Sequence, residues 1–343
     1  MNLESEDNLI GPWVQFLRTG DPRLFYHAEA HTEHVATVDH RHTYPDPRTH
    51  EAVIFYHTER HYDGGPAPSH AVTSGMLLGY HVTGDRAWRE TAVAAADHFV
   101  TSQQKAGDGW YAGHDPSRQN VAPMTAVMNA YTLTWDPRYL ASVERFLPVW
   151  LPVQDPGKYN QAGVETWAWS EFLRLTPHGD IADLLCRWTD RTRRDLGMRA
   201  MNVYHLPGMV YRWETTGDPA WLAYCRTIIE AQEYDLVSRG TSETAHRLVL
   251  GYPDLPYGWV NGFHGAALAA LEEGRCKNVD IDAGLRALQA DRAAASGLPP
   301  QDTVYYEGQV DSEGASPGTL RYYNKQRVEV DGRPLEAQGQ LTR

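Results

Sequence analysis

The sequence predicts an all-α protein in which six helical hairpins close into a ring, followed by a short β-rich tail. Three observations predict this fold. A short turn of the Thr-Gly-Asp type recurs along the chain, an amphipathic helix follows each such turn, and the segments between hairpins are long. Because only the long connections vary in length, we expect a closed (α/α)6 toroid rather than an open solenoid, whose repeats keep a nearly constant length.

The recurring turn marks the start of the second helix in each hairpin. Its Asp caps that helix, a following Pro suits the first helical position, and its Gly allows the left-handed conformation that ends the preceding helix. The turns lie at Thr19–Pro22, Thr83–Asp85, Thr134–Pro137, Pro177–Asp180 and Thr216–Pro219. The sixth hairpin has no such turn.

The two helices of each hairpin are expected to lie in two concentric rings. The inner helices are predicted at Leu9–Arg18, His70–Val82, Ala122–Leu133, Gln161–Leu175, Val203–Glu214 and Gly262–Glu273. The outer helices are predicted at Pro22–Thr37, Arg86–Gln103, Pro137–Trp150, Ile181–Leu196, Pro219–Val237 and Ala283–Ala295. The long loops, at 38–69, 104–121, 151–160, 197–202 and 238–261, then open on one face, where function usually resides.

The pattern changes after residue 296. Pro299 and Pro300 break the helical periodicity, and residues 303–306, 320–323 and 328–330 are predicted strands with turns between them. A further strand is expected around Val53–Tyr56. The sequence therefore predicts two domains: a helical toroid at 1–296, and a β-rich tail, or the start of a β domain, at 297–343.

Composition narrows the classes of function. The chain has 343 residues and a formal net charge of −13, which argues against a nucleic-acid partner. No apolar segment approaches the ~18 residues of a membrane span. The first residues lack the features of a signal peptide, so we expect a cytoplasmic protein or a domain of a longer secreted one. Cys186, Cys225 and Cys276 form no CxxC pair and are expected to be free thiols.

Three histidines form a candidate metal site. His27, His31 and His34 are spaced i, i+4 and i+7, which places them on one face of the first outer helix. Histidine pairs at i, i+4 suit zinc. The alternative is a face that packs against a neighbour or lies in solvent. Calcium or zinc is the candidate cofactor, although the sequence requires none.

The loop that leads into the second inner helix has the densest group of proton-active side chains. It contains His57, Glu59, Arg60, His61, Tyr62, Asp63 and His70. Helix N-termini favour anions, arginine pairs with carboxylates, and His and Tyr transfer protons. The alternative is a loop held together by hydrogen bonds. Trp110, Asn160, His205, Tyr257 and His264 are expected on the same face, as parts of a groove that grips polysaccharide.

Three stretches resemble the helical toroid domain of rhamnogalacturonan exolyase-like polysaccharide lyases. They are EDNLIGPW, HAEAHTEHVATVD and HTERHYDGGPAPSHAVTSGMLLGYHVTGD, and the resemblance covers about residues 5–105. Beyond that region only the hairpin pattern is similar. Members of the family are usually much longer, with β domains around the toroid. The resemblance implies cleavage of an acidic, uronate-containing, pectin-like polysaccharide by β-elimination, without membrane or nucleic-acid partners.

Roles in such a reaction follow from chemistry and placement. The carboxylate of the uronate is neutralised by Arg60, Asn160 or a bound metal ion. His61 or His70 is the base, and Tyr62 or Tyr257 is the acid. The remaining substrate-binding candidates are His57, Trp110, His205 and His264.

Two other classes of function remain open. The first is a glycoside hydrolase, such as an unsaturated uronyl hydrolase, which needs a carboxylic acid. The candidate carboxyl groups are Asp39, Glu59, Asp63, Asp115 and Glu165. The second is a toroid that binds glycans without cutting them. A lyase differs from both, because its unsaturated product absorbs in the near ultraviolet.

Overall fold

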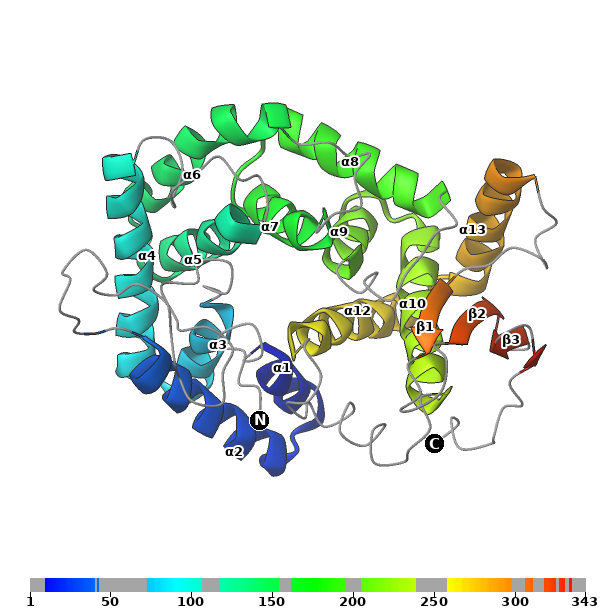
Figure 1. Ribbon diagram of the computed structural model, residues 1–343, viewed down its shortest axis with the longest axis horizontal. Coiled ribbons are helices and arrows are strands. Elements are labelled where there is room, and N and C mark those ends of the chain that lie inside the picture. Colours follow the sequence, from blue (N-terminus) through cyan, green and yellow to red (C-terminus); the bar gives the residue numbers. More distant parts are fainter. Residues whose placement is uncertain are drawn as a thin grey trace. The chain divides into compact units, whose positions relative to one another are not determined.

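The computed structural model covers the whole chain and describes eleven separate parts of it. They are residues 10–40, 42, 73–106, 118–153, 162–194, 205–238, 258–297, 306–310, 318–324, 327–330 and 333–334. In these parts the chain forms twelve α-helices and one small β-sheet (Figure 1). None of the described helices has the length and apolarity needed to cross a membrane.

The twelve helices form six consecutive pairs, each joined by a short turn, which confirms the all-α prediction. The first helices are α1 (Ile10–Thr19), α3 (Ser74–Thr83), α5 (Arg118–Thr134), α7 (Ala162–Leu175), α9 (Leu206–Thr216) and α12 (Gly258–Cys276). The second helices are α2 (Pro22–His34), α4 (Arg86–Ala106), α6 (Pro137–Trp150), α8 (Gly179–Arg194), α10 (Pro219–Ser238) and α13 (Ile281–Ser296). Closure of these pairs into a ring stays a prediction.

Four of the turns share one hydrogen-bonding scheme. At the turn between α3 and α4, the Thr83 hydroxyl donates to the Gly79 carbonyl over 2.8 Å and accepts from the Asp85 N–H over 3.1 Å. The Asp85 carboxylate accepts from the Ala87 N–H over 2.8 Å. The same three bonds recur at residues 19–21, 134–136 and 216–218. The threonine thus closes one helix and the aspartate opens the next.

The middle residue of these turns has a left-handed backbone. Its φ is +69° at Gly20, +78° at Gly84 and +68° at Gly217, where the lack of a Cβ removes the steric penalty. The fourth turn has φ +57° at Trp135, a bulky residue in the same conformation.

The other two turns are built differently. Gly179 is already the first residue of α8, where the His178 Nδ1 atom accepts from the Ile181 N–H over 3.4 Å. The sixth turn contains Asn278 at φ +55°, and Asp280 caps α13 by accepting from the Ala283 N–H over 2.8 Å.

The end of the first outer helix differs from the prediction. Instead of continuing as an α-helix to Thr37, the chain passes at residue 35 into the π-helix η2 (Val35–Asp39). The short 3-10 segment η5 (Leu151–Val153) follows α6, and α5 begins four residues before the predicted start at Ala122. The predicted strand around Val53–Tyr56 lies outside the described residues.

The chain divides into two compact units, which are described separately. Unit 1 comprises Met1–Leu184 and Leu250–Gly265, and unit 2 comprises Leu185–Val249 and Ala266–Arg343. In unit 1 the first helices contact one another in series, α1 with α3, α3 with α5, and α5 with α7. Among the outer helices of this unit, α4 contacts α6. The first helices of unit 1 therefore form one continuous row.

Trp13 of α1 is the centre of an aromatic core in unit 1. Its ring is fully buried, and its centroid lies 5.7 Å from that of Phe25 and 6.1 Å from that of Trp88. Its indole N–H donates to the Thr32 hydroxyl over 2.9 Å, which satisfies the polar end of the side chain. These contacts join α1, α2 and α4 around one residue.

In unit 2, α10 lies against α9, α13 and the first two strands of the sheet. Arg193 joins three segments of this unit, with ion pairs of 2.6 Å to Asp218 and to Asp291. The antiparallel sheet runs in the order β1 (Tyr306–Val310), β2 (Gly318–Asn324), β3 (Arg327–Val330) and β4 (Arg333–Pro334). A domain boundary at residue 296 stays a prediction.

Candidate functional site

Three histidines lie on successive turns of α2. We call His27, His31 and His34 the histidine face. The ring centroids of His27 and His31 lie 6.0 Å apart. The His34 Nε2 atom lies 3.8 Å from an Asp39 carboxylate oxygen, which the π-helical turn of η2 brings within reach. Single π-helical turns are frequent at functional sites.

His31 is the buried member of the histidine face. Only 7% of the residue is exposed, and neither ring nitrogen has a hydrogen-bond partner among the described residues. Burial lowers the pKa of His31 to about 3, and the neighbouring His27 and His34 add to the shift. His31 is therefore neutral at physiological pH, which is the form that ligates metals.

The described residues do not by themselves make a metal site. In the parts of the chain that the structure covers, no group of three or more His, Cys, Asp or Glu residues is placed to hold a metal ion. A metal at the histidine face would therefore need ligands from other parts of the chain. The metal assignment of His27, His31 and His34 stays a prediction.

A second polar cluster lies at the start of α9 in unit 2. The ring of His205 packs edge-on against Trp188, with centroids 4.5 Å apart and planes at 89°. Its Nδ1 atom lies 3.3 Å from the Tyr224 hydroxyl oxygen. His205 is 5% exposed, and burial lowers its pKa to about 3, with a further contribution from the cation of Arg292. The cluster therefore combines a neutral imidazole with a phenol.

Arg292 of α13 is the third member of this cluster. The residue is fully buried, and its Nε–H donates to the Arg193 carbonyl over 3.1 Å. The guanidinium carbon lies 5.5 Å from the ring centroid of Tyr224. A buried cation beside a neutral imidazole and a phenol is a charge arrangement that stabilises negative charge.

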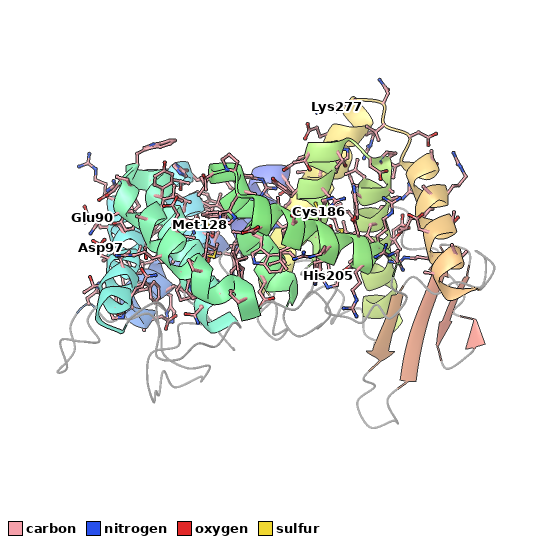
Figure 2. The ribbon with its side chains drawn as sticks, turned by 90° about the horizontal axis from the view of Figure 1, so that it is seen from above. Glu90, Asp97, Met128, Cys186, His205 and Lys277 are labelled. Carbon is pink, nitrogen blue, oxygen red and sulfur yellow. The ribbon has the colours of Figure 1, made fainter. Side chains whose placement is uncertain are left out.

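The cluster lies at the end of α9 that faces away from the short turn of its hairpin. In Figure 2, His205 is labelled on the opposite side of the unit 2 helices from Lys277, which lies in the turn between α12 and α13. The Lys277 ammonium lies 5.4 Å from the ring centroid of Trp213, in the last turn of α9. His205 therefore lies where the long connections of the predicted toroid begin.

Most of the predicted site lies outside the described residues. This holds for the catalytic candidates His61, Tyr62, His70 and Tyr257, and for the substrate-binding candidates His57, Arg60, Trp110 and Asn160. His264 lies in α12. His205 is described, and the contacts of its ring are with protein groups. The roles of all ten residues stay predictions.

Two of the five candidate carboxyl groups of the hydrolase alternative are described. Glu165 is 7% exposed and lies in the first turn of α7, at the same end of its hairpin as His205 in its own. Asp39 is 4% exposed, at the end of η2. Glu59, Asp63 and Asp115 lie outside the described parts of the chain.

The sequence prediction missed Arg292 and Tyr224. A signal for Arg292 was present, because it follows the fully buried Leu288 by four residues and so shares its helix face. An arginine in a buried stripe indicates a partner in the interior. Tyr224 carries no comparable signal, since aromatic residues fill cores throughout this chain.

Comparison with known proteins identifies no family. No protein-family model, no curated protein and no solved structure matches the chain. The resemblance of the N-terminal third to polysaccharide lyases therefore stays a prediction.

Proposed function

We propose that the chain is a polysaccharide lyase that cleaves a uronate-containing, pectin-like glycan by β-elimination on an (α/α)6 toroid. The observation that carries the proposal is the stretch His57–Asp85, which resembles the helical domain of rhamnogalacturonan exolyase-like lyases. Its second half coincides with α3, which is the first helix of the second of six pairs, and with the turn that follows α3. The candidate catalytic residues of the stretch, His61, Tyr62 and His70, precede α3.

The packing of α12 supports the closed ring. Gly265 of α12 lies against Val14 of α1, so near that a Cβ at this position would collide with the valine side chain. Both residues belong to unit 1. This neighbourhood within unit 1 is compatible with the closed ring that we propose.

The direction of the helices supports one active face. Each first helix runs toward its short turn, so its N-terminal end points to the side of the long connections. Glu165 and His205 lie at such N-terminal ends. His61 and His70 precede the N-terminal end of α3, so the proposal places them on the same side.

The proposed reaction has three parts. Arg60 neutralises the uronate carboxylate, or Asn160 donates a hydrogen bond to it, which acidifies the proton at C5; a bound divalent metal ion would supply the same positive charge. His61 or His70 takes that proton, the C5–H electron pair becomes the C4–C5 double bond, and the C4–O bond breaks. Tyr62 or Tyr257 donates a proton to the leaving oxygen. General acid–base steps of this kind typically contribute about 10²–10⁴ in rate.

A hydrolase on the same scaffold is the second candidate, and Glu165 is the observation that favours it. A buried carboxyl group at the long-loop end of a first helix is the type of residue that protonates a leaving group or hydrates a double bond. Such an enzyme releases reducing ends, or consumes unsaturated uronates, without forming new ultraviolet absorbance.

The experiment is a substrate panel with an ultraviolet readout. The protein is incubated with polygalacturonate, rhamnogalacturonan and other uronate polysaccharides, with and without divalent metal, while absorbance and reducing ends are followed. A lyase raises both. Reducing ends without absorbance, or loss of the absorbance of an unsaturated oligosaccharide, assign the hydrolase. Binding without either change assigns a non-catalytic toroid.

A further inference from the structure

The turn between α5 and α6 contains a residue that the fold does not explain. Its hydrogen bonds match those of the turns at Gly20, Gly84 and Gly217, yet its left-handed position is occupied by Trp135. Bulky residues are rare in this conformation, and strained positions of this kind concentrate at functional sites. Three equivalent turns of the same chain have glycine at this position, which is the residue that a left-handed backbone prefers.

Burial does not compensate for the strained position of Trp135. The residue is 74% exposed, the highest value among the exposed large hydrophobic residues of the described chain. Its intramolecular contact is with Tyr131 on the last turn of α5, where the two rings meet edge to face with centroids 5.7 Å apart. Tyr131 thus contacts the indole, and most of the surface of Trp135 stays in water.

Charged residues follow Trp135 in the chain. Arg138, in the first turn of α6, donates to Asp136 over 2.8 Å and to Asp97 over 2.5 Å, and all three side chains are between 41% and 50% exposed. Figure 2 shows Asp97 at the outer edge of α4. A shallow hollow of about 370 Å³ lies between α4 and α6 and is lined by Arg138, Glu144 and Arg145. The aromatic residue of this turn is therefore followed, within three positions, by hydrogen-bond donors and acceptors.

The size of the apolar surface decides between classes of partner. The other exposed large hydrophobic residues of the described chain are Leu17, Tyr26 and Val38, which belong to α1, α2 and η2. One indole presents on the order of 200 Å², whereas a stable protein interface buries about 800 Å² on each partner. A single exposed ring in a turn with charged residues instead fits one sugar ring, whose C–H groups stack on the aromatic face.

We propose that Trp135 and Tyr131, with Asp136 and Arg138 beside them, form an auxiliary binding site for a polysaccharide chain at the short-turn end of unit 1. The site holds a glycan without cleaving it, because it lies at the opposite end of the helices from the proposed catalytic loop. That the glycan is an acidic one rests on the proposed function, whereas stacking of a sugar ring on Trp135 does not.

The test is electrophoresis in native gels with and without polygalacturonate, rhamnogalacturonan, or neutral xylan and arabinan. Trp135→Gly is the decisive variant, because glycine restores the residue of the three equivalent turns and the variant therefore folds. Trp135→Tyr is the matched control, since it keeps an aromatic face at the same position. Far-ultraviolet circular dichroism of both variants verifies the helical fold.

We expect the parent protein to be retarded by at least one polysaccharide. Trp135→Gly should bind about tenfold more weakly, because it loses the apolar contact area of one ring. Trp135→Tyr should keep most of the retardation. Equal retardation of the parent and Trp135→Gly overturns the proposal, as does a parent that no polysaccharide retards. Self-association of the parent that Trp135→Gly abolishes, measured by sedimentation, would assign the ring to a protein contact and also overturn it.

The outcome is separable from that of the proposed function. Retardation that depends on Trp135, in a protein that forms no ultraviolet-absorbing product, supports this site and contradicts the lyase. Product formation with retardation that Trp135→Gly leaves unchanged supports the lyase and contradicts this site.

Discussion

Buried neutral histidine should make this protein sensitive to acid, and His205→Asn tests that expectation. Burial beside Arg292 lowers the pKa of His205 to about 3 in the folded protein, from the ordinary 6.5 of an unfolded chain. At a pH below the pKa of the unfolded chain, the imidazole is protonated in the unfolded state but stays neutral in the folded state. Above about pH 6.5 this group therefore takes nothing from the unfolding free energy, which falls as the pH drops toward the pKa of the folded state.

The size of the effect follows from the two pKa values. At about pH 5 the unfolded state gains roughly 2 kcal/mol from protonation of this single site, while at about pH 7 it gains only a few tenths. His31, whose pKa is also lowered to about 3, adds a second loss of similar size. The parent should therefore lose roughly 4 kcal/mol between these pH values, before other groups are counted.

Urea unfolding at the two pH values measures this loss. The informative quantity is the change in unfolding free energy between about pH 7 and pH 5 within each protein, because His205→Asn also loses the contact with Trp188 at both. We expect the change to shrink by roughly 2 kcal/mol in His205→Asn. His81→Asn, which removes an exposed imidazole, is the control and should follow the parent. A His205→Asn protein with the parent's full pH dependence would show that His205 is not a source of the acid sensitivity.

Three further predictions concern the turns, the thiols and the histidine face. Gly84→Ala should lower the unfolding free energy by about 1 kcal/mol, because a Cβ there meets no atom within 4 Å and only its φ of +78° is unfavourable. Gly179→Ala, with equal space but no positive φ, should instead stabilise α8 slightly in the same urea titration. A thiol reagent should modify the exposed Cys276 in the native protein and reach Cys225, whose pKa burial raises to about 12, only on unfolding. If the histidine face binds a metal ion, a chelator should lower the melting temperature and zinc should restore it. An unchanged melting temperature would assign these histidines to packing.

The helices could be predicted because their signals are local. The hydroxyl of Thr83 and the carboxylate of Asp85 form their bonds within a few residues of the chain, so the sequence of the turn is enough to place it. The same argument explains the four turns that share this scheme. The sixth turn lacked the pattern and was correspondingly uncertain in sequence, since Asn278 replaces glycine at the left-handed position.

Features that depend on distant neighbours were not predictable in the same way. The change from α2 into the π-helix at Val35 leaves no recognisable mark in the sequence. The contact of Gly265 with Val14 joins residues about 250 positions apart, which no local pattern reports. Arg292 lies between these two cases. Its position on a buried helix face could be read from the local sequence, but its hydrogen-bond partner on α8 could not.

The same difference between local signals and long-range contacts applies to the candidate site. Residue chemistry located the histidines of α2 and His205, and the structure adds that His31 and His205 are buried and neutral. The grouping of His61, His70 and Tyr257 depends on three-dimensional placement of long loops, for which the sequence offers only the topology of the hairpins. Their roles therefore rest on the proposed fold.

A direct measurement of the proposed β-elimination compares the parent with the double variant His61→Ala/His70→Ala on the best uronate polysaccharide. Ultraviolet absorbance is followed over time, and circular dichroism verifies the helical content of both proteins. His81→Ala, at the far end of α3, is the matched control and should keep the parent rate. We expect the double variant to remain folded and to lose at least about a hundredfold of the initial rate. A folded double variant that forms unsaturated product at the parent rate would contradict it.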